Sequence, residues 1–364
     1  MLDKNSQRFH FKLKAQEVLA GYDVDDVAIC TICSHSALQI FHGARQEGFR
    51  TIGITKSEVK EFYDAFPKAG ADEYIVVSDF REILSPEIQD KLIKENAIIV
   101  PHGSFVEYVG ADAIQQSFHV PVFGNKTSLK WESSRDRLRQ WVQDSGLRFP
   151  KEYSNTEQIE GLAIAKLSGA KGGEGYFLVG KGEKVSKGYT LQEYVIGVRY
   201  YPHFFYTPLS RTGLATGEGS IELLSIDKRI ESNIDEIFRM GMTRGQLKRY
   251  GIIPSFVVTG NMPIVVREAL LPKLMTMGRK VVESSLKLFY PGIVGPFCLE
   301  TICTPDLEFV TFEISARIVA GTNLYPVGSP YSPYIYDEPM STGRRIAGEL
   351  RLAIKKNMLK KVVS

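Results

Sequence analysis

Short β-rich runs alternate with helix-like stretches over the first third of the chain, and this alternation limits the fold more than any other feature. The runs at 27–32, 51–55, 74–77 and 97–100 are apolar, and helix-length stretches separate them. Strands joined by helices pair in parallel, in a sheet that is covered on both faces. We therefore expect a Rossmann-like α/β domain over residues 1–125.

Polar segments follow two of these runs. Ser34, His35 and Ser36 come after the first run, and His102 and Ser104 come after the fourth. The carboxyl ends of parallel strands meet at one edge of a sheet, where ligands bind. Hydroxyls and free amides that open a helix favour an anion such as phosphate. A lone histidine after a strand is more often structural, but two such segments on one edge favour a binding site.

A glycine-rich segment at 168–175 separates two further β-rich runs, at 163–167 and 176–179. Four of its eight residues are glycine, so backbone N–H groups can approach phosphate oxygens without obstruction by Cβ atoms. Lys166 and Lys171 add two cations. A strand, a turn and a strand do not make a Walker P-loop, which opens a helix. The segment suits the phosphates of ATP, although a plain flexible loop is an equally common interpretation.

Two glutamates, Glu300 and Glu313, interrupt apolar runs late in the chain, and these runs are expected to pair as antiparallel strands. Adjacent buried carboxylates repel and are costly unless they are paired or bound to a metal. Mg²⁺ takes one or two carboxylates together with substrate phosphates. Salt bridges to Arg317 or Lys166 are the alternative. The glycine-rich segment favours the metal, because it separately predicts a nucleotide.

Glu193 begins another apolar segment, which includes Val195. Such a segment suits an adenine-binding edge, with backbone groups for the base and a carboxylate for the ribose, but the signal is weak by itself. Elsewhere the pattern predicts a helix over 129–144 and strands at 255–258 and 264–267. It also predicts a basic amphipathic helix over 344–363 that packs on the surface.

Composition excludes several classes of function. The chain has 45 basic and 42 acidic residues, and this balance gives no general attraction to nucleic acid or to membranes. The N-terminal residues are polar, and no apolar run approaches the length that crosses a bilayer. We expect a cytoplasmic protein with reduced, buried thiols at Cys30, Cys33, Cys298 and Cys303.

These features occur together in one known family. The glycine-rich segment, the segment at 193–195 and the late glutamate pair resemble the ATP-grasp superfamily in order and role. Over nearly the whole chain, specific strings look like the archaeal formate-dependent AICAR-formylating synthetases, also called 5-formaminoimidazole-4-carboxamide ribonucleotide synthetases. These strings are ICSHSALQIFHGARQEGF, VPHGSFVEYVG, VFGNKTSLKWESSRDR, AKGGEGYF, VVTGNMPIVVRE, GPFCLET and FEISARIVAGTN.

The resemblance implies an N-terminal α/β domain at 1–125, an ATP-grasp subdomain with the glycine-rich flap at 126–200, and an α+β subdomain with the metal site at 201–364. It also implies formylation of AICAR to FAICAR through formyl phosphate, with release of ADP and phosphate, in purine synthesis. A homo-oligomer is expected, without nucleic-acid or membrane partners. A related ligase for another acid or amine, and a non-catalytic nucleotide-binding protein, are the alternatives.

Residue roles follow from the same resemblance. Glu300 and Glu313 are expected to hold Mg²⁺ or Mn²⁺, while Arg317 and Lys171 act on the formate or the transferred phosphoryl group. The expected AICAR contacts are His35, Ser36, Ser104 and Asn261. The expected ATP contacts are Lys166, Lys171, Gly172, Gly173, Gly175, Glu193, Val195 and either Glu231 or Asn233.

Two residues depart from the ATP-grasp pattern. Ser315 stands where many members have an asparagine metal ligand, and serine is the weaker ligand. Glu174 places an anion inside the phosphate-binding flap. If its side chain faces inward, it repels ATP and favours the related ligase with altered activity.

Overall fold

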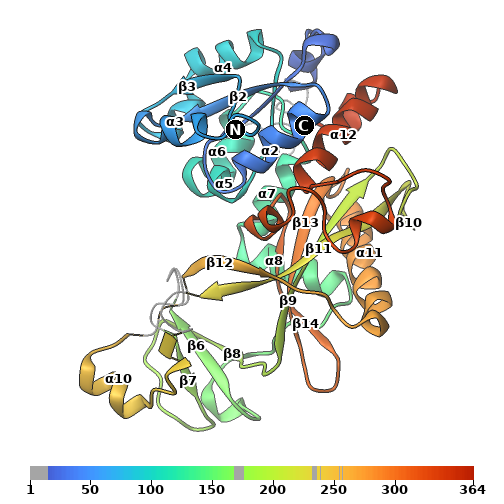
Figure 1. Ribbon diagram of the computed structural model, residues 1–364. Helices are drawn as coiled ribbons and strands as arrows, with labels where there is room; N and C mark the ends of the chain where they lie inside the picture. Colours follow the sequence, from blue (N-terminus) through green and yellow to red (C-terminus); the bar gives the residue numbers. More distant parts are fainter. Residues whose placement is uncertain (1–14, 168–175, 232–235, 238, 254, 256) are drawn as a thin grey trace, which may run out of the picture.

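Three sheets follow one another along the molecule (Figure 1). The computed structural model describes residues 15–167, 176–231, 236–237, 239–253, 255 and 257–364. A four-stranded sheet lies at the top of the view, a six-stranded sheet in the middle and a second four-stranded sheet at the lower left.

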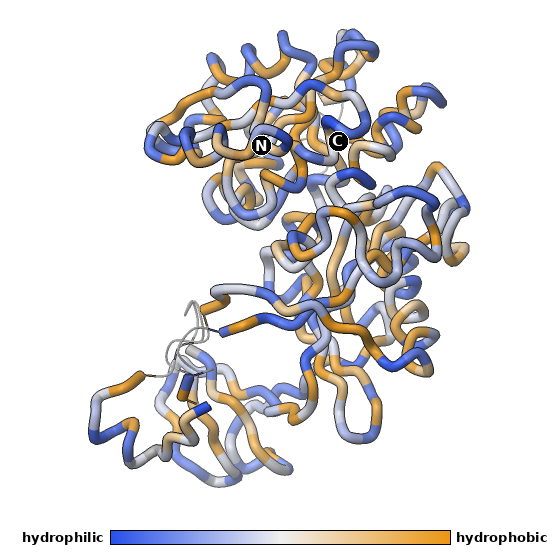
Figure 2. The backbone as a smooth tube through the Cα atoms, in the orientation of Figure 1, coloured by the Kyte–Doolittle hydropathy of each residue, from blue (hydrophilic) through white to orange (hydrophobic). Residues whose placement is uncertain are grey.

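The N-terminal sheet is parallel, as the sequence predicts, with the strand order β3-β2-β1-β4. Every residue of β1 is buried, because helices cover both faces of such a sheet. Figure 2 shows apolar and polar residues alternating along these helices. The strands are β1 (Ala28–Ile32), β2 (Arg50–Thr55), β3 (Glu73–Val76) and β4 (Ala97–Ile99), and the helices are α2 (Ala37–Gln46), α3 (Ser57–Asp64), α4 (Pro86–Lys94), α5 (Gly103–Val109) and α6 (Ala111–Ser117).

The central sheet has the order β10-β11-β9-β13-β14, with β12 paired to β11. One face carries apolar side chains, among them Phe204 and Phe297, which form a core with Leu274 and Val281 of α11 (Leu271–Leu288). Side chains alternate between the two faces along each strand. The charged residues that alternate with these apolar strand residues therefore point to the other face of the sheet. The strands are β9 (Val198–Thr207), β10 (Leu214–Thr216), β11 (Gly219–Glu231), β12 (Val258–Pro263), β13 (Gly295–Cys303) and β14 (Phe309–Ser315).

The third sheet has the order β5-β8-β6-β7 and a small apolar core of its own. Strands β6 and β7 are antiparallel neighbours, as predicted for the strands on either side of the glycine-rich segment. That segment, 168–175, lies outside the described residues. The strands are β5 (Glu152–Tyr153), β6 (Ala163–Leu167), β7 (Phe177–Val179) and β8 (Tyr189–Glu193).

Three predicted elements are wrong. The single helix over 129–144 is two helices, α7 (Lys126–Glu132) and α8 (Arg135–Asp144). Ser134 adopts an extended conformation between them, because serine favours helix ends over helix interiors. The two strands predicted at 255–258 and 264–267 are also wrong, since the strand that the structure describes in this part of the chain is β12, which ends at Pro263.

The C-terminal helix is shorter and more deeply packed than predicted. It is α12 (Thr342–Lys355), and Asn357, with a positive φ of 55°, follows its end. Its backbone touches that of α2, because a Cβ on Gly43 would lie 2.1 Å from the Arg344 nitrogen. Arg345, on the buried face, pairs with the buried carboxylate of Glu222 at 2.8 Å. The helix therefore joins the N-terminal and central sheets.

Other predictions can be compared directly. The four cysteines are free and buried, as expected. Within the described part of the chain, no helix is both long and apolar enough to cross a membrane. The domain bounds at 125 and 200 stay a prediction, although the three sheets occupy residues 28–99, 198–315 and 152–193.

Candidate active site

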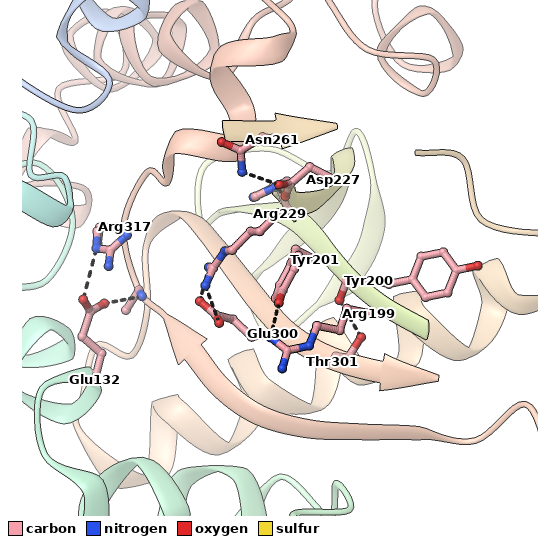
Figure 3. Close-up of polar contacts among 12 residues, drawn as sticks. Glu132, Arg199, Tyr200, Tyr201, Asp227, Arg229, Asn261, Glu300, Thr301 and Arg317 are labelled. Carbon is pink, nitrogen blue, oxygen red and sulfur yellow. Dashed lines mark hydrogen bonds and ion pairs between the residues drawn. The ribbon is translucent and has the colours of Figure 1, made fainter. Parts of the chain in front are cut away.

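Glu300 and Glu313 face each other on β13 and β14, where the sequence predicts their meeting. Neither predicted salt-bridge partner, Arg317 or Lys166, holds them. Instead Arg229 on β11 binds both carboxylate oxygens of Glu300, and its Nη1 donates to Oε2 at 2.8 Å (Figure 3). The Arg229 guanidinium also lies over the Tyr201 ring, 4.4 Å from its centroid.

Glu313, unlike Glu300, has no cationic partner among the described residues. Among the residues that the structure describes, it forms neither a hydrogen bond nor an ion pair. The charge of Glu300, together with burial, raises the pKa of Glu313 to about 8. An added cation would remove this repulsion. The pair therefore fits a divalent metal.

A metal at this position would need further ligands. Over the described ranges no group of three or more histidine, cysteine, aspartate or glutamate side chains has the spacing of a metal site. Two carboxylates are sufficient for Mg²⁺, which commonly keeps waters and takes its other oxygens from phosphates. Ser315 has a buried hydroxyl with no hydrogen-bond partner among these residues.

Arg317 lies between the glutamates and the histidine segments. Its Nε donates to Glu132 Oε1 at 3.1 Å, and the Ala316 N–H donates to the other oxygen of Glu132. Burial raises the pKa of Glu132, an effect that the positive charge of Arg317 opposes. A Cβ on Gly103 would lie 2.9 Å from His35 Nε2, so glycine leaves room for the His35 ring, and the guanidinium carbon of Arg317 lies beside it at 3.5 Å from the same position.

The two polar segments of the N-terminal sheet meet, as the sequence predicts. Ser34 Oγ and Ser104 Oγ are 2.9 Å apart, and the rings of His35 and His102 are stacked with their centroids 5.3 Å apart. His35 Nδ1 lies 2.8 Å from Ser36 Oγ. The five residues of the two predicted segments therefore occupy one edge, next to Arg317.

Both histidines at this edge are neutral at ordinary pH. Burial, followed by the charges of His102 and Arg317, lowers the pKa of His35 to about 2. Burial also lowers the pKa of His102 to about 4, and Arg317 contributes to this shift. His102 Nε2 donates to the carbonyl of Ile32 at 2.8 Å, so its Nδ1 is an acceptor. This edge therefore offers neutral hydrogen-bonding groups beside one fixed cation.

Asn261, on β12, lies opposite Arg229 in the register of β11 and β12. Its Nδ2 donates to Asp227 Oδ2 at 2.6 Å. Asp227 Oδ1 is 2.6 Å from His203 Nε2, and both of these side chains are almost completely buried. Asn261, which is predicted to contact AICAR, thus lies close to the glutamate pair. Its amide is held by a hydrogen bond to the buried carboxylate of Asp227.

Cations gather on the side where ATP is expected. Lys166 Nζ donates to Gln192 Oε1 at 2.6 Å. Burial lowers the pKa of Lys166, and the positive charges of Arg135 and Arg199 lower it further. Arg199 Nη1 donates to Glu231 at 3.0 Å, so Glu231 neutralises part of this charge. A polyphosphate would relieve the remaining repulsion among the cations.

The predicted adenine segment lies farther along β8. The carboxylate of Glu193 pairs with Arg148 and accepts a hydrogen bond from the Lys151 N–H at 3.0 Å. Glu193 and Tyr194 also line a cavity of about 440 Å³. Val195 is half-buried. Predicted residues outside the described part of the chain are Lys171, Gly172, Gly173, Gly175, Glu174 and Asn233.

Sequence reasoning missed Arg229, Arg199, Asp227 and Glu132. The first three interrupt β-rich stretches at 198–207 and 219–231, which were not recognised as strands. A charged residue inside such a stretch is the same signal that identified the two glutamates. Glu132 gave no comparable signal, because its burial depends on Arg317, far away in the sequence.

Comparisons with known proteins bear on the family of the chain. Residues 29–153 match a family described as a protein of unknown function (DUF1246), and residues 180–364 match a domain of unknown function (DUF1297). A 5-formaminoimidazole-4-carboxamide-1-(beta)-D-ribofuranosyl 5'-monophosphate synthetase from Methanococcoides burtonii is 50% identical over 97% of this chain and 99% of the relative. A relative of the same name from Methanothrix thermoacetophila is 51% identical over 96% and 98%.

Solved structures give the same result. The IMP biosynthesis protein PurP from Thermococcus kodakaraensis has a TM-score of 0.72 and 31% identity, over 92% of this chain and 100% of that one. An N5-carboxyaminoimidazole ribonucleotide synthetase from Thermotoga maritima has a TM-score of 0.55 and 14% identity, over 90% and 76%, and shows the shared fold alone. The chain therefore has the ATP-grasp fold and belongs to the family of 5-formaminoimidazole-4-carboxamide ribonucleotide synthetases.

Proposed function

We propose that this protein uses ATP to join formate to the 5-amine of AICAR, producing FAICAR, ADP and phosphate. The names of relatives that are about half identical over nearly the full length support this reaction. The observation that carries it is the position of Glu313, which faces Glu300 without a partner among the described residues. Two adjoining carboxylates are costly in a protein that only binds nucleotide.

Glu300 and Glu313 would hold Mg²⁺ or Mn²⁺ from one side. The metal, when bound, supplies positive charge to the phosphate oxygens of ATP. Lys166 and Arg199 provide further positive charge next to this site, and Arg135 lies near Lys166. Arg229 orients Glu300 by binding both of its oxygens.

Formate and the transferred phosphoryl group would lie near Arg317, whose position Glu132 fixes. An oxygen of formate attacks the γ-phosphorus, the bond from phosphorus to the ADP oxygen breaks, and formyl phosphate forms. The AICAR amine then attacks the formyl carbon, phosphate leaves with the electrons of the C–O bond, and the amine loses a proton. Phosphoryl transfer of this kind depends on positioning and on charge more than on covalent protein chemistry.

AICAR would lie between the N-terminal and central sheets. Ser104, Ser36 and His35 at the histidine edge would hold its 5′-phosphate end, with Arg317 nearby as the cation. Asn261 would face the part of the molecule close to the glutamate pair. This arrangement directs the acceptor amine toward the metal.

The test is a reconstitution with purified protein, ATP, Mg²⁺, formate and AICAR, followed by chromatography of FAICAR and ADP. We expect one FAICAR for each ADP, and no ADP when formate or AICAR is omitted. Hydrolysis of ATP only with another carboxylate or another amine would assign the chain to a different ligase reaction. Binding of ATP without turnover in any combination would contradict an enzymatic role.

We also propose three domains, at 1–125, 126–200 and 201–364, in a cytoplasmic homo-oligomer. The third sheet has an apolar core of its own, which supports a separate unit within the ATP-grasp part of the chain. Light scattering on the purified protein would give the number of subunits.

A further inference from the structure

We infer that Asp227 fixes the orientation of the Asn261 amide, so that the site accepts a substrate with an N–H donor and rejects one with an anionic oxygen in its place. This inference rests on the proposed function. It assigns a positioning role to Asp227, a buried residue that contacts Asn261 in the same site. It concerns the choice between the carboxamide of AICAR and the corresponding carboxylate.

The hydrogen bonds around Asp227 leave one orientation for the amide. Asp227 Oδ2 accepts from Asn261 Nδ2 at 2.6 Å, and Oδ1 lies 2.6 Å from His203 Nε2. The NH₂ group of Asn261 is the donor in this hydrogen bond, so it faces the Asp227 side chain. The carbonyl oxygen of Asn261 therefore points away from Asp227, as Figure 3 shows.

Packing prevents Asp227 from turning. Its side chain is 1% exposed and that of His203 is 3% exposed. A Cβ on Gly321 would lie 2.3 Å from Asp227 Oδ1, so the backbone of the 320–324 segment lies directly against the carboxylate. The position of the carboxylate is thus set by the fold, and the orientation of the Asn261 amide follows from it.

The Asn261 carbonyl oxygen, which points away from Asp227, is a hydrogen-bond acceptor. A carboxamide offers N–H donors to the Asn261 oxygen. A carboxylate at the same place offers none, and its negative charge would face the Asn261 oxygen with Asp227 behind it. A site built to hydrogen-bond a substrate N–H can reject an analogue without it by a factor of about 10⁴.

The experiment compares two acceptors, AICAR and the ribonucleotide with a carboxylate in place of the carboxamide, in the wild type and in Asp227→Asn. Affinity by calorimetry and kcat/KM for formylation are measured for each. The neutral side chain allows the Asn261 amide to turn over, so we expect the preference for the carboxamide to fall by about 100-fold or more. The KM for ATP should stay within about twofold, because Asp227 acts on the acceptor only.

Glu349→Gln is the matched control. Glu349 is as deeply buried as Asp227, and it accepts hydrogen bonds from Thr207 and Arg345 at 2.7 and 2.8 Å, on the side of α12. We expect a comparable fall in thermal stability and an unchanged preference between the two acceptors. A loss of preference in this variant as well would contradict a specific role of Asp227.

A second variant covers the case in which Asp227→Asn does not fold. Asn261→Ser keeps the buried Asp227–His203 pair and replaces the half-buried amide, and the same loss of preference is expected. An unchanged preference in either folded variant, with normal FAICAR formation by the wild type, would overturn this inference and leave the proposed function intact. Failure of the wild type to formylate AICAR would overturn the proposed function, and the affinities would still report on Asp227.

Discussion

Two pairs of like titratable groups lie near Arg317, and their surroundings shift the pKa values of the two pairs in opposite directions. On the central sheet, Glu300 and Glu313 are both acidic, and their repulsion raises the pKa of Glu313 to about 8. On the N-terminal sheet, the rings of His35 and His102 stack, and burial lowers the pKa of each. The two glutamates have too little positive charge around them, whereas the two histidines stay uncharged.

The difference indicates which ligand each region receives. A pair of acids without enough countercharge gains from a metal cation, and the binding energy of the metal offsets the repulsion in the free protein. A neutral pair beside a fixed arginine gains nothing from a cation and can hydrogen-bond an anion without changing its protonation. Each prediction below tests one side of this contrast.

Replacing Glu313, the carboxylate that lacks a countercharge, should have the largest effect on activity. We expect Glu313→Gln to lower kcat by about 10³-fold or more, because it removes one of two protein ligands to the metal. Initial rates of FAICAR formation measure this, and thermal unfolding without ligands checks the fold. Glu308→Gln is the control, since Glu308 is exposed on the same hairpin and pairs with Lys273. Near-normal turnover by Glu313→Gln would contradict the metal assignment.

Arg229→Met should destabilise the protein by about 3 kcal/mol, because it leaves Glu300 buried beside Glu313 without its cation. Urea unfolding at pH 8 measures this, and saturating Mg²⁺ and ATP should recover part of the loss. Arg239→Met, which removes an exposed pair with Glu236, should produce no measurable change. Equal stability of the two variants would show that Glu300 needs no countercharge.

Much of this contrast could be predicted from the sequence, because both pairs follow from strand pairing. Alternation of strands and helices places His35 and His102 on one edge. A hairpin places Glu300 opposite Glu313. Such local patterns are repeated along the chain, so one sequence is sufficient to recognise them.

The partners of these pairs could not be predicted in the same way. Arg229 reaches Glu300 across the intervening strand β9, and Glu132 reaches Arg317 from a helix whose end depends on a serine. These contacts depend on sheet order and on the angle between elements, which hydrophobic periodicity does not give. The sequence therefore predicts the glutamate and histidine pairs but not the charged residues that surround them, such as Arg229 and Glu132.

The histidine edge should respond to substitution without a pH-dependent step. We expect His35→Asn to weaken AICAR binding by about tenfold, because it removes a ring that packs on His102 and one substrate hydrogen bond. Asparagine tolerates the positive φ of 53° at this position. His42→Asn, on α2, is the control. Calorimetry between about pH 5 and pH 8 should show no step from these histidines, whose pKa values lie below that range. A step near pH 6.5 that His35→Asn removes would contradict their neutrality.

The smallest expected effect is a proton released when the metal binds. With a pKa of about 8, Glu313 is mostly protonated at pH 7 in the free protein, and a cation favours its charged form. The raised pKa also means that the contribution of Glu313 to folding stability is greatest in acid and is lost as the pH rises through 8. We therefore expect Mg²⁺ and ATP to displace about one proton at pH 7 and fewer at higher pH, and to stabilise the protein most in alkali. Calorimetry in two buffers with different ionisation enthalpies counts the proton, and Glu313→Gln should release none. Equal proton release by the wild type and this variant would mean that the cation binds elsewhere.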